Sequence, residues 1–287
     1  MRLELVGTQR YAVLSRRAAR QRWFGRSVAA FTGYATRVDY GDAALHALME
    51  PHLRNMRAAR PTTDSTVTAR VLRYDAGRHE LAESLRSALG VASLESCACV
   101  DAHAKRALLA PLLDLTTRRT FQRAYDAWVC GVVLPALAGD ATRVRYQHFP
   151  CVRAHCPGEM TLAPHCDAAY GHAASTIIVS ALLTRAFGTN ALIYESSPGR
   201  EDWKAFEGCE GDALAFPGGL AAHFTSENTT RHTRWSIDVR VLVSHAATSA
   251  YDEGCYFAVV ERADGAWRRI GDGDAVDPRV GIPFDRK

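Results

Sequence analysis

The chain has 287 residues, a formal net charge of +4 at pH 7 and 47% hydrophobic residues. This composition is typical of a globular protein and excludes the disordered and collagen-like classes. No apolar run approaches the roughly 18 to 20 residues that cross a bilayer, so we expect no membrane-spanning segment. The basic residues are spread along the chain, which makes a nucleic-acid partner unlikely on charge grounds.

The beginning of the chain is rich in arginine. Residues 6–38 carry seven arginines and no acidic residue. Such a composition is typical of an organelle transit peptide, although an exposed basic helix is the interpretation that we favour. No apolar segment follows the first charges, so we do not expect a secretory signal. These observations predict a cytoplasmic or organellar protein, in which the eight scattered cysteines stay reduced.

The N-terminal half is predicted to be helical in three places. These are residues 78–89, 102–113 and 118–137. In the first and third, apolar residues recur at helical spacing near one face, and Gly90 supplies a stop for the first. Helices with one apolar face usually brace a sheet. We therefore expect residues 1–142 to form a helical and wrapping region that packs on a core.

From residue 143 onward the pattern changes to short β-prone runs separated by proline and glycine. This spacing is typical of a sandwich or barrel. The clearest strand is 234–243, where apolar and polar residues alternate strictly. Residues 258–262 and 266–270 flank Asp264-Gly265 and predict a hairpin. We expect residues 143–287 to form the β core of one integrated domain.

Three residues of this half have the types and order of a metal site. An iron(II) oxygenase needs three ligands on one face of the metal, and two histidines with one carboxylate supply them. His165 and Asp167 are two apart, so on an extended strand their side chains point to the same side. His223 follows a glycine turn on a later segment, where a neighbouring strand can bring it to the same metal. A single His-x-Asp pair occurs often by chance, but the ordered set predicts a metal site.

A candidate anion anchor follows His223. An arginine fork matches a planar carboxylate with paired hydrogen bonds, and Arg234 is followed two residues later by Ser236. Both lie on one face of the predicted strand, so both can bind the distal carboxylate of 2-oxoglutarate. The alternative for this face is a polar surface in contact with water. The nearby His223 favours the anchor.

Other polar residues near the ligands are candidates for holding a substrate. They are Arg153, Tyr170 and His172. An ordinary surface role is the alternative for each. Asn190 follows Gly188 and is expected to make a turn. Asp238 and Arg240 continue the polar face of Arg234, and we expect them to pair with each other.

These motifs resemble a known family. The matching sequence motifs are Phe149-Pro150, Arg153, Pro157-Gly158, His165-Cys166-Asp167, Tyr170-Gly171-His172, Leu183-Thr184-Arg185, residues 188–192, Glu195-Ser196, Pro198-Gly199, Asn228-Thr229 and residues 233–240. Residues 143–243 thus resemble the Fe(II)/2-oxoglutarate dioxygenase superfamily of phytanoyl-hydroxylase type. Within it they resemble the aminoglycoside-biosynthesis group of the streptomycin and kanamycin pathways.

The resemblance implies a mainly β fold with helices, built on a double-stranded β-helix, or jelly-roll, core. It places His165, Asp167 and His223 on Fe(II), and Arg234 and Ser236 on 2-oxoglutarate. Related iron halogenases lack the carboxylate, so Asp167 favours hydroxylation, desaturation or ring formation. The group tends to carry acidic and amide residues where this chain has Thr176 and Ile178. We therefore do not predict the group's aminoglycoside substrate for this chain.

The sequence therefore predicts an oxygenase that uses Fe(II), 2-oxoglutarate and O₂ to oxidise a small polar metabolite. Two alternatives remain open at this point. One is a jelly-roll binding or regulatory protein without turnover, which the intact ligand set argues against. The other is an oxygenase acting on a protein or nucleic acid, which only the basic N-terminus favours. The oligomeric state is not predicted.

Overall fold

The computed structural model describes residues 67–97, 102–162, 164–243 and 256–270, with residues 54, 57 and 58 and two short paired strands near the N-terminus. These strands are β1 (Glu4–Val6) and β2 (Gln9–Tyr11). Most of the arginine-rich segment 6–38 lies outside the described residues. The transit-peptide prediction therefore stays a prediction.

The three predicted helical segments are confirmed. The helices are α3 (Ala76–His79), α4 (Leu81–Leu89), α5 (Ala102–Leu109), α6 (Leu115–Trp128) and α7 (Leu134–Leu137). The first segment is split, because Glu80 has a left-handed φ of 45° between α3 and α4. Gly90 ends α4 at φ 67°, as expected of a glycine cap. Helix α6 begins earlier than predicted, because the Asp114 carboxylate accepts the N–H of Thr117.

The chain is mainly β. The larger sheet contains β3 (Arg70–Arg73), β4 (Arg143–Gln147), β5 (Cys151–His155), β6 (Ile177–Leu182), β9 (Asp212–Phe216), β11 (Arg234–Leu242), β12 (Phe257–Ala263) and β13 (Ala266–Ile270). Its order is β13-β12-β4-β11-β6-β9-β3, with β5 also paired to β11. A smaller sheet has the order β10-β7-β8, from β7 (Leu192–Tyr194), β8 (Lys204–Phe206) and β10 (His223–Thr225).

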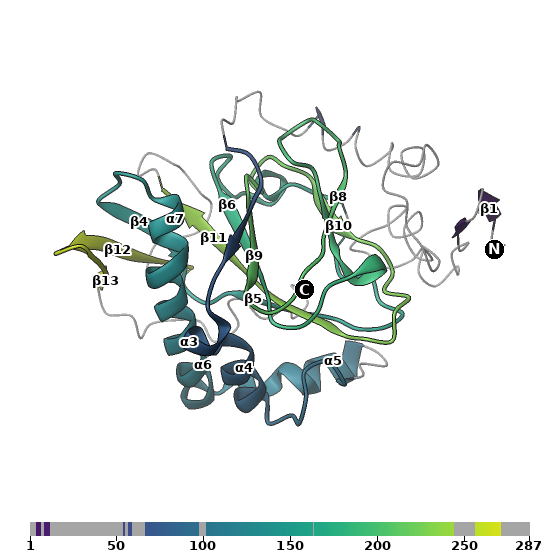
Figure 1. The fold of residues 1–287 in the computed structure, drawn as a ribbon, viewed down its shortest axis with the longest axis horizontal. Coiled ribbons are helices and arrows are strands. Elements are labelled where there is room, and N and C mark those ends of the chain that lie inside the picture. Colours follow the sequence, from purple (N-terminus) through teal and green to yellow (C-terminus); the bar gives the residue numbers. More distant parts are fainter. Residues whose placement is uncertain are drawn as a thin grey trace.

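All the strand pairs are antiparallel, and the larger sheet curls into a half-barrel (Figure 1). This arrangement is consistent with a jelly-roll-like fold. The predicted hairpin is confirmed as β12 and β13, whose turn residues Asp264 and Gly265 both have positive φ.

The N-terminal helices cover the outer face of the larger sheet. Buried side chains of α4 and α6, such as Tyr125 and Trp128, share one hydrophobic core with Trp235 and Ile237 of β11. The indole Nε1 of Trp235 donates to the carbonyl of Leu94 at 2.7 Å, which ties the segment after α4 to the central strand. The apolar side chains of the alternating pattern in β11 therefore pack against the helices.

The inner face of the larger sheet meets the smaller sheet. Ile178 of β6 and Phe216 of β9 form a second core with Leu192 of β7 and Phe206 of β8. The polar side chains of β11 point to this inner side. Every residue of β11, whichever face it lies on, is buried. The alternative of a polar face in contact with water was therefore wrong.

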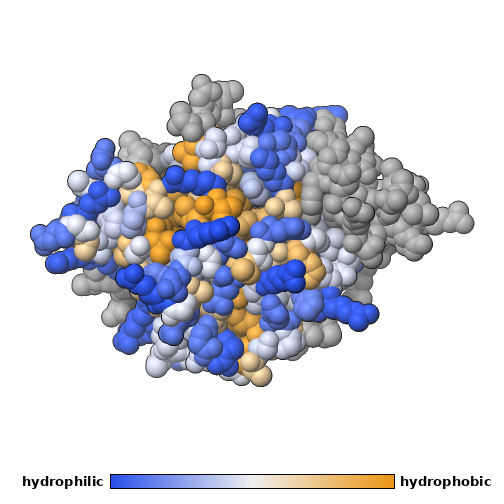
Figure 2. All heavy atoms as spheres, viewed as in Figure 1, coloured by the Kyte–Doolittle hydropathy of each residue, from blue (hydrophilic) through white to orange (hydrophobic). Residues whose placement is uncertain are grey.

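The face of the molecule viewed in Figure 2 mixes hydrophobic and hydrophilic side chains. In Figure 2, hydrophobic side chains gather near the middle of the face viewed in Figure 1, and hydrophilic side chains interrupt them. Within the described part of the chain, no helix combines the length and hydrophobicity that crossing a membrane requires.

A glycine turn between β9 and β10 supports one of the predicted ligands. The carbonyl of Gly218 accepts the N–H of Asp167 at 3.0 Å, and the carbonyl of Gly219 accepts the N–H of Ala168 at 2.9 Å. A Cβ on Gly219 would lie 2.5 Å from the carbonyl oxygen of Ala174. Only glycine fits there, because that oxygen belongs to the backbone and cannot swing away.

We predict that Gly219→Ala lowers the free energy of unfolding by about 1–3 kcal/mol, the usual cost of overpacking a filled site. Urea unfolding followed by circular dichroism measures it. Gly131→Ala is the matched control, because its Cβ would meet only the end of the His79 side chain at 3.4 Å. Equal stability of the two variants would contradict the tight approach.

Candidate functional site

Two histidines are brought together by backbone pairing. His165 and His223 form an isolated antiparallel bridge, with N···O distances of 3.2 and 3.0 Å in the two directions. Side chains of directly opposed residues lie on the same face of a sheet. The ring centroids are accordingly 4.3 Å apart. Sequence pattern predicted this convergence, although His165 makes only a single bridge and belongs to no regular strand.

Asp167 reaches the same place from a turn. It begins a short 3₁₀ helix, Asp167–Tyr170, so the expected continuous strand through His165 and Asp167 was wrong. Only Cys166 between them is extended, with φ −118° and ψ 151°, and its buried side chain points away. Gly171 closes the helix at φ 87°. Because Cys166 is extended, the side chains of His165 and Asp167 still lie on the same side of the backbone.

The three side chains converge on one point. Their potential ligand atoms all lie within 4.8 Å of one another. Asp167 Oδ1 is 3.6 Å from Nε2 of His165 and 3.9 Å from Nε2 of His223. This oxygen is buried and has no hydrogen-bond partner among the described residues. A buried carboxylate oxygen facing two imidazole nitrogens fits a metal cation, which would satisfy it.

The second nitrogen of His223 defines its tautomer. Nδ1 lies 3.1 Å from the carbonyl of Ala221, which can only accept, so Nδ1 carries the proton. Nε2 then keeps its lone pair toward Asp167. Burial also lowers the pKa of His223, although Asp167 opposes the shift. The imidazole is therefore neutral at pH 7, the form that binds metals.

Asp167 is held ionised by its surroundings. Burial by itself would raise its pKa, but the Arg240 guanidinium and then the histidines outweigh burial. The resulting pKa lies well below the usual range for aspartate. The Arg240 Nε to Asp167 Oδ2 distance is 2.6 Å. Asp167 is thus an ionised carboxylate at neutral pH, with one oxygen paired to Arg240 and the other without a hydrogen-bond partner among the described residues.

The predicted anchor forms a second polar group on the same inner face. Arg234 is 2% exposed; its Nε donates to the Asn190 carbonyl at 2.9 Å, and its terminal nitrogen donates to Ser236 Oγ at 2.6 Å. No described carboxylate lies within 4.0 Å of its guanidinium, the limit for an ion pair. Burial lowers the pKa of Arg234 to about 10, while Asp238 opposes the shift. A buried guanidinium without an acidic partner suits an incoming carboxylate.

The remaining charges of β11 pair differently from the expectation. Asp238 and Arg240 do not form the predicted mutual pair. Asp238 accepts from Arg153 at 3.0 Å and from Ser180 at 2.8 Å, while Arg240 pairs with Asp167. The register explains this, because Asp238 pairs with Ser180 of β6 and Arg153 lies on adjacent β5. Arg153 therefore faces the interior and is no surface arginine.

The other two substrate candidates flank the ligands. Tyr170 is 55% exposed, and its ring lies 5.2 Å from that of His165 in an edge-on arrangement. It stands at the rim of the site. His172 is buried and packs 5.5 Å from the ring of Tyr256. Neither position by itself assigns a role in substrate binding.

Several supporting residues were not found from the sequence. Asn190 makes the predicted turn, and its carbonyl also orients Arg234 and lies 3.2 Å from Nδ1 of buried His155. Glu195 has a structural role: its carboxylate accepts the N–H of Ala222, next to His223, at 2.7 Å. Neither of these roles had a signal in the sequence pattern, whereas Arg240 was visible because it shares the period-two face of Arg234.

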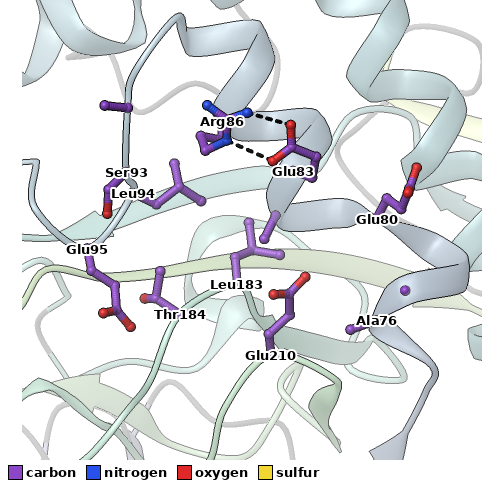
Figure 3. A pocket seen from close by; sticks show the side chains of 13 residues that line it. Ala76, Glu80, Glu83, Arg86, Ser93, Leu94, Glu95, Leu183, Thr184 and Glu210 are labelled. Atoms are coloured by element: carbon purple, nitrogen blue, oxygen red, sulfur yellow. Dashed lines mark hydrogen bonds and ion pairs between the residues drawn. The ribbon is translucent and has the colours of Figure 1, made fainter.

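A surface groove beside α4 is separate from this site. Its volume is about 510 Å³, and its polar lining includes Glu80, Glu83, Arg86, Glu95 and Glu210. Figure 3 shows Glu83 and Arg86 joined by two contacts at its edge. None of the predicted ligands or anchor residues lines it. We assign it no part in the chemistry.

Comparison with known proteins gives one clear relative. No family model matches the chain. The streptomycin biosynthesis protein StrG of Streptomyces griseus is 29% identical over 177 residues, which cover 60% of this chain and 83% of that protein. The resemblance predicted from the motifs is confirmed.

Solved structures of two non-heme enzymes are also similar. The monooxygenase ThoJ is 13% identical with a TM-score of 0.45, over 73% of this chain and 82% of ThoJ. The epimerase SnoN, in complex with Fe³⁺, α-ketoglutarate and nogalamycin RO, is 15% identical with a TM-score of 0.35, over 70% of this chain and 86% of SnoN.

We predict that Glu195→Gln lowers the free energy of unfolding by about 1–3 kcal/mol, because an amide N–H₂ would then face backbone N–H donors. The donors are Ala222, Gly199 and Glu201. Denaturant unfolding measures the effect. Glu207→Gln is the control, since this exposed carboxylate accepts one N–H, from Gly188. A loss no larger than the control's would contradict the role of Glu195.

Proposed function

We propose that this protein is an Fe(II)- and 2-oxoglutarate-dependent oxygenase acting on a small polar metabolite. In the reaction, 2-oxoglutarate and O₂ are consumed, succinate and CO₂ are released, and one C–H bond of the substrate is hydroxylated or otherwise oxidised. The observation that carries the proposal is the orphaned Oδ1 of Asp167 between two imidazole nitrogens. Bound ferrous ion would supply the activation of O₂ that side chains cannot provide.

Each part of the inner face has a role in this proposal. His165, Asp167 and His223 would hold the metal, and their grouping on one side leaves positions for the cosubstrate. Arg234 and Ser236 would bind the distal carboxylate of 2-oxoglutarate and orient its keto acid end toward the metal. Arg153, Tyr170 and His172 are proposed to contact the substrate.

The same proposal includes the architecture. The two sheets would be the faces of a double-stranded β-helix, with the segment of His165 continuing the smaller sheet beside β10. Backbone pairs support this, because Thr225 donates to the Leu162 carbonyl and His223 pairs with His165. Residues 143–287 would be the catalytic core and residues 1–142 the region that wraps it, together forming one domain.

Turnover tests the proposal directly. Purified protein supplied with Fe(II), 2-oxoglutarate, ascorbate and O₂ should form succinate, and small-molecule extracts should contain a compound that gains one oxygen or loses two hydrogens. Asp167→Ala should abolish both signals. A protein that forms no succinate with any extract would instead be a binding protein. Retardation of labelled nucleic acid at physiological salt would favour a macromolecular substrate.

We predict that Arg234→Ala raises the Kd for 2-oxoglutarate at least about 30-fold, the effect of losing about 2 kcal/mol from a buried charged contact. Isothermal titration of the Mn(II)-loaded protein measures this under conditions without turnover. The Kd for Mn(II) should change less than about threefold, because Arg234 forms no hydrogen bond with any of the three predicted metal ligands.

Arg143→Ala is the matched control for the anchor. This arginine lies on β4 with a partly exposed side chain and a long 3.9 Å contact to Glu261. Its loss should leave the affinity for 2-oxoglutarate unchanged. An Arg234→Ala variant that binds Mn(II) and 2-oxoglutarate as the wild type does would exclude Arg234 as the anchor.

A further inference from the structure

We propose that Arg240 is a positioning residue that limits Asp167 to a single metal-binding oxygen. The inference rests on the proposed metal site and assigns it a fourth protein component. Among the described residues, Arg240 forms no hydrogen bond with Arg234 or Ser236, the predicted anchor for 2-oxoglutarate. It acts through Asp167, by committing one carboxylate oxygen and leaving the other for the metal.

The two oxygens of Asp167 have different surroundings. Oδ2 accepts from Arg240 Nε at 2.6 Å, a short charge-assisted contact between side chains that are 1% and 9% exposed. Oδ1 has no hydrogen-bond partner among the described residues and faces His165 and His223. The asymmetry therefore belongs to the protein before any metal binds.

Arg240 is itself held in place on its other edge. Its terminal nitrogen donates to Oε1 of Gln147 at 3.0 Å and contacts the sulfur of Cys151 at 3.3 Å. The Gln147 amide nitrogen is in turn fixed on the carbonyl of Phe149 at 2.8 Å. These contacts come from β4, β5 and the loop between them, so they anchor the guanidinium to the rigid sheet. A guanidinium can make both sets of contacts at once because its donors are spread over a planar fork.

A second aspartate–arginine pair involving β11 has both carboxylate oxygens engaged within the protein. Asp238 also accepts from an arginine, with Arg153 Nε at 3.0 Å from Oδ2. Its Oδ1, however, accepts from Ser180 Oγ at 2.8 Å. Both oxygens of Asp238 are thus satisfied inside the protein. Asp167 differs because one oxygen is kept available.

The charge on Arg240 explains why one oxygen is excluded. Binding through both oxygens would place a divalent cation and a guanidinium on Oδ2 together, where their charges repel. With Oδ2 held by Arg240, Asp167 would occupy only one coordination position of a bound metal ion. The positions left over are those that a two-point keto acid and O₂ require.

Orientation and charge have opposite effects on metal affinity, which makes the role testable. Removing a cation beside the site would by itself strengthen metal binding. Losing the partner that orients a ligating carboxylate typically weakens metal binding by about 10–100-fold. The proposal therefore predicts a loss of affinity, while a role limited to charge predicts a gain.

The experiment compares full-length wild type, Arg240→Met, Arg240→Lys and Arg153→Met by anaerobic titration with Co(II). Arg240→Met should bind Co(II) about 10–100-fold more weakly, with altered visible absorption bands. Arg240→Lys should recover only part of the affinity, since an ammonium cannot contact Asp167 and Gln147 together. Arg153→Met breaks the comparable pair and should keep the wild-type Kd and spectrum.

Each alternative outcome overturns a defined claim. Equal or tighter Co(II) binding by Arg240→Met, with an unchanged spectrum, would overturn the positioning role while leaving the metal site intact. An equal loss in Arg153→Met would show general destabilisation of the sheet and would also overturn it. Failure of the wild type to bind Co(II) would overturn the metal site itself, and with it this role. If Arg240→Met does not fold, Arg240→Lys decides, and a wild-type Kd and spectrum in that variant would overturn the proposal.

Discussion

The structure depends on the central strand β11, which is buried on both faces although one face is charged. Charges taken out of water need partners, because desolvation is otherwise too costly. Asp238 pairs with Arg153 of β5, and Arg240 pairs with Asp167. Arg234 has no acidic partner among the described residues, so an anionic ligand would complete the set.

This requirement links the fold to the site. The apolar face of β11 packs under the helices, and Trp235 Nε1 reaches back to Leu94. That packing fixes the register of the strand, and a strand that slipped by one residue would turn Arg234 and Arg240 into the apolar core. The position of the anchor relative to Asp167 is therefore set by hydrophobic packing on the opposite side of the sheet.

Local pattern predicted the elements that are decided locally. The helices, the β11 strand and the β12–β13 hairpin each have a periodicity or turn signal within a few residues, and the ordered histidines and aspartate indicated the candidate metal site. Partner choice was not predictable in this way. The expected pair of Asp238 with Arg240 was wrong. Cross-strand register brings Arg153 close to Asp238, and the turn that contains Asp167 brings its carboxylate to Arg240. Both depend on contacts between segments far apart in the sequence. The roles of the Asn190 carbonyl and the Glu195 carboxylate likewise depend on contacts between distant loops.

The backbone bridge between His165 and His223 has a consequence for how the proposed metal site would be maintained. Main-chain hydrogen bonds and the surrounding apolar core hold both histidines together, whereas in small zinc domains the metal itself makes that link. Under the proposed function, an iron ion lost from the site could then be replaced while the polypeptide stays folded. Catalysis would in that case be limited by the supply of ferrous iron rather than by refolding.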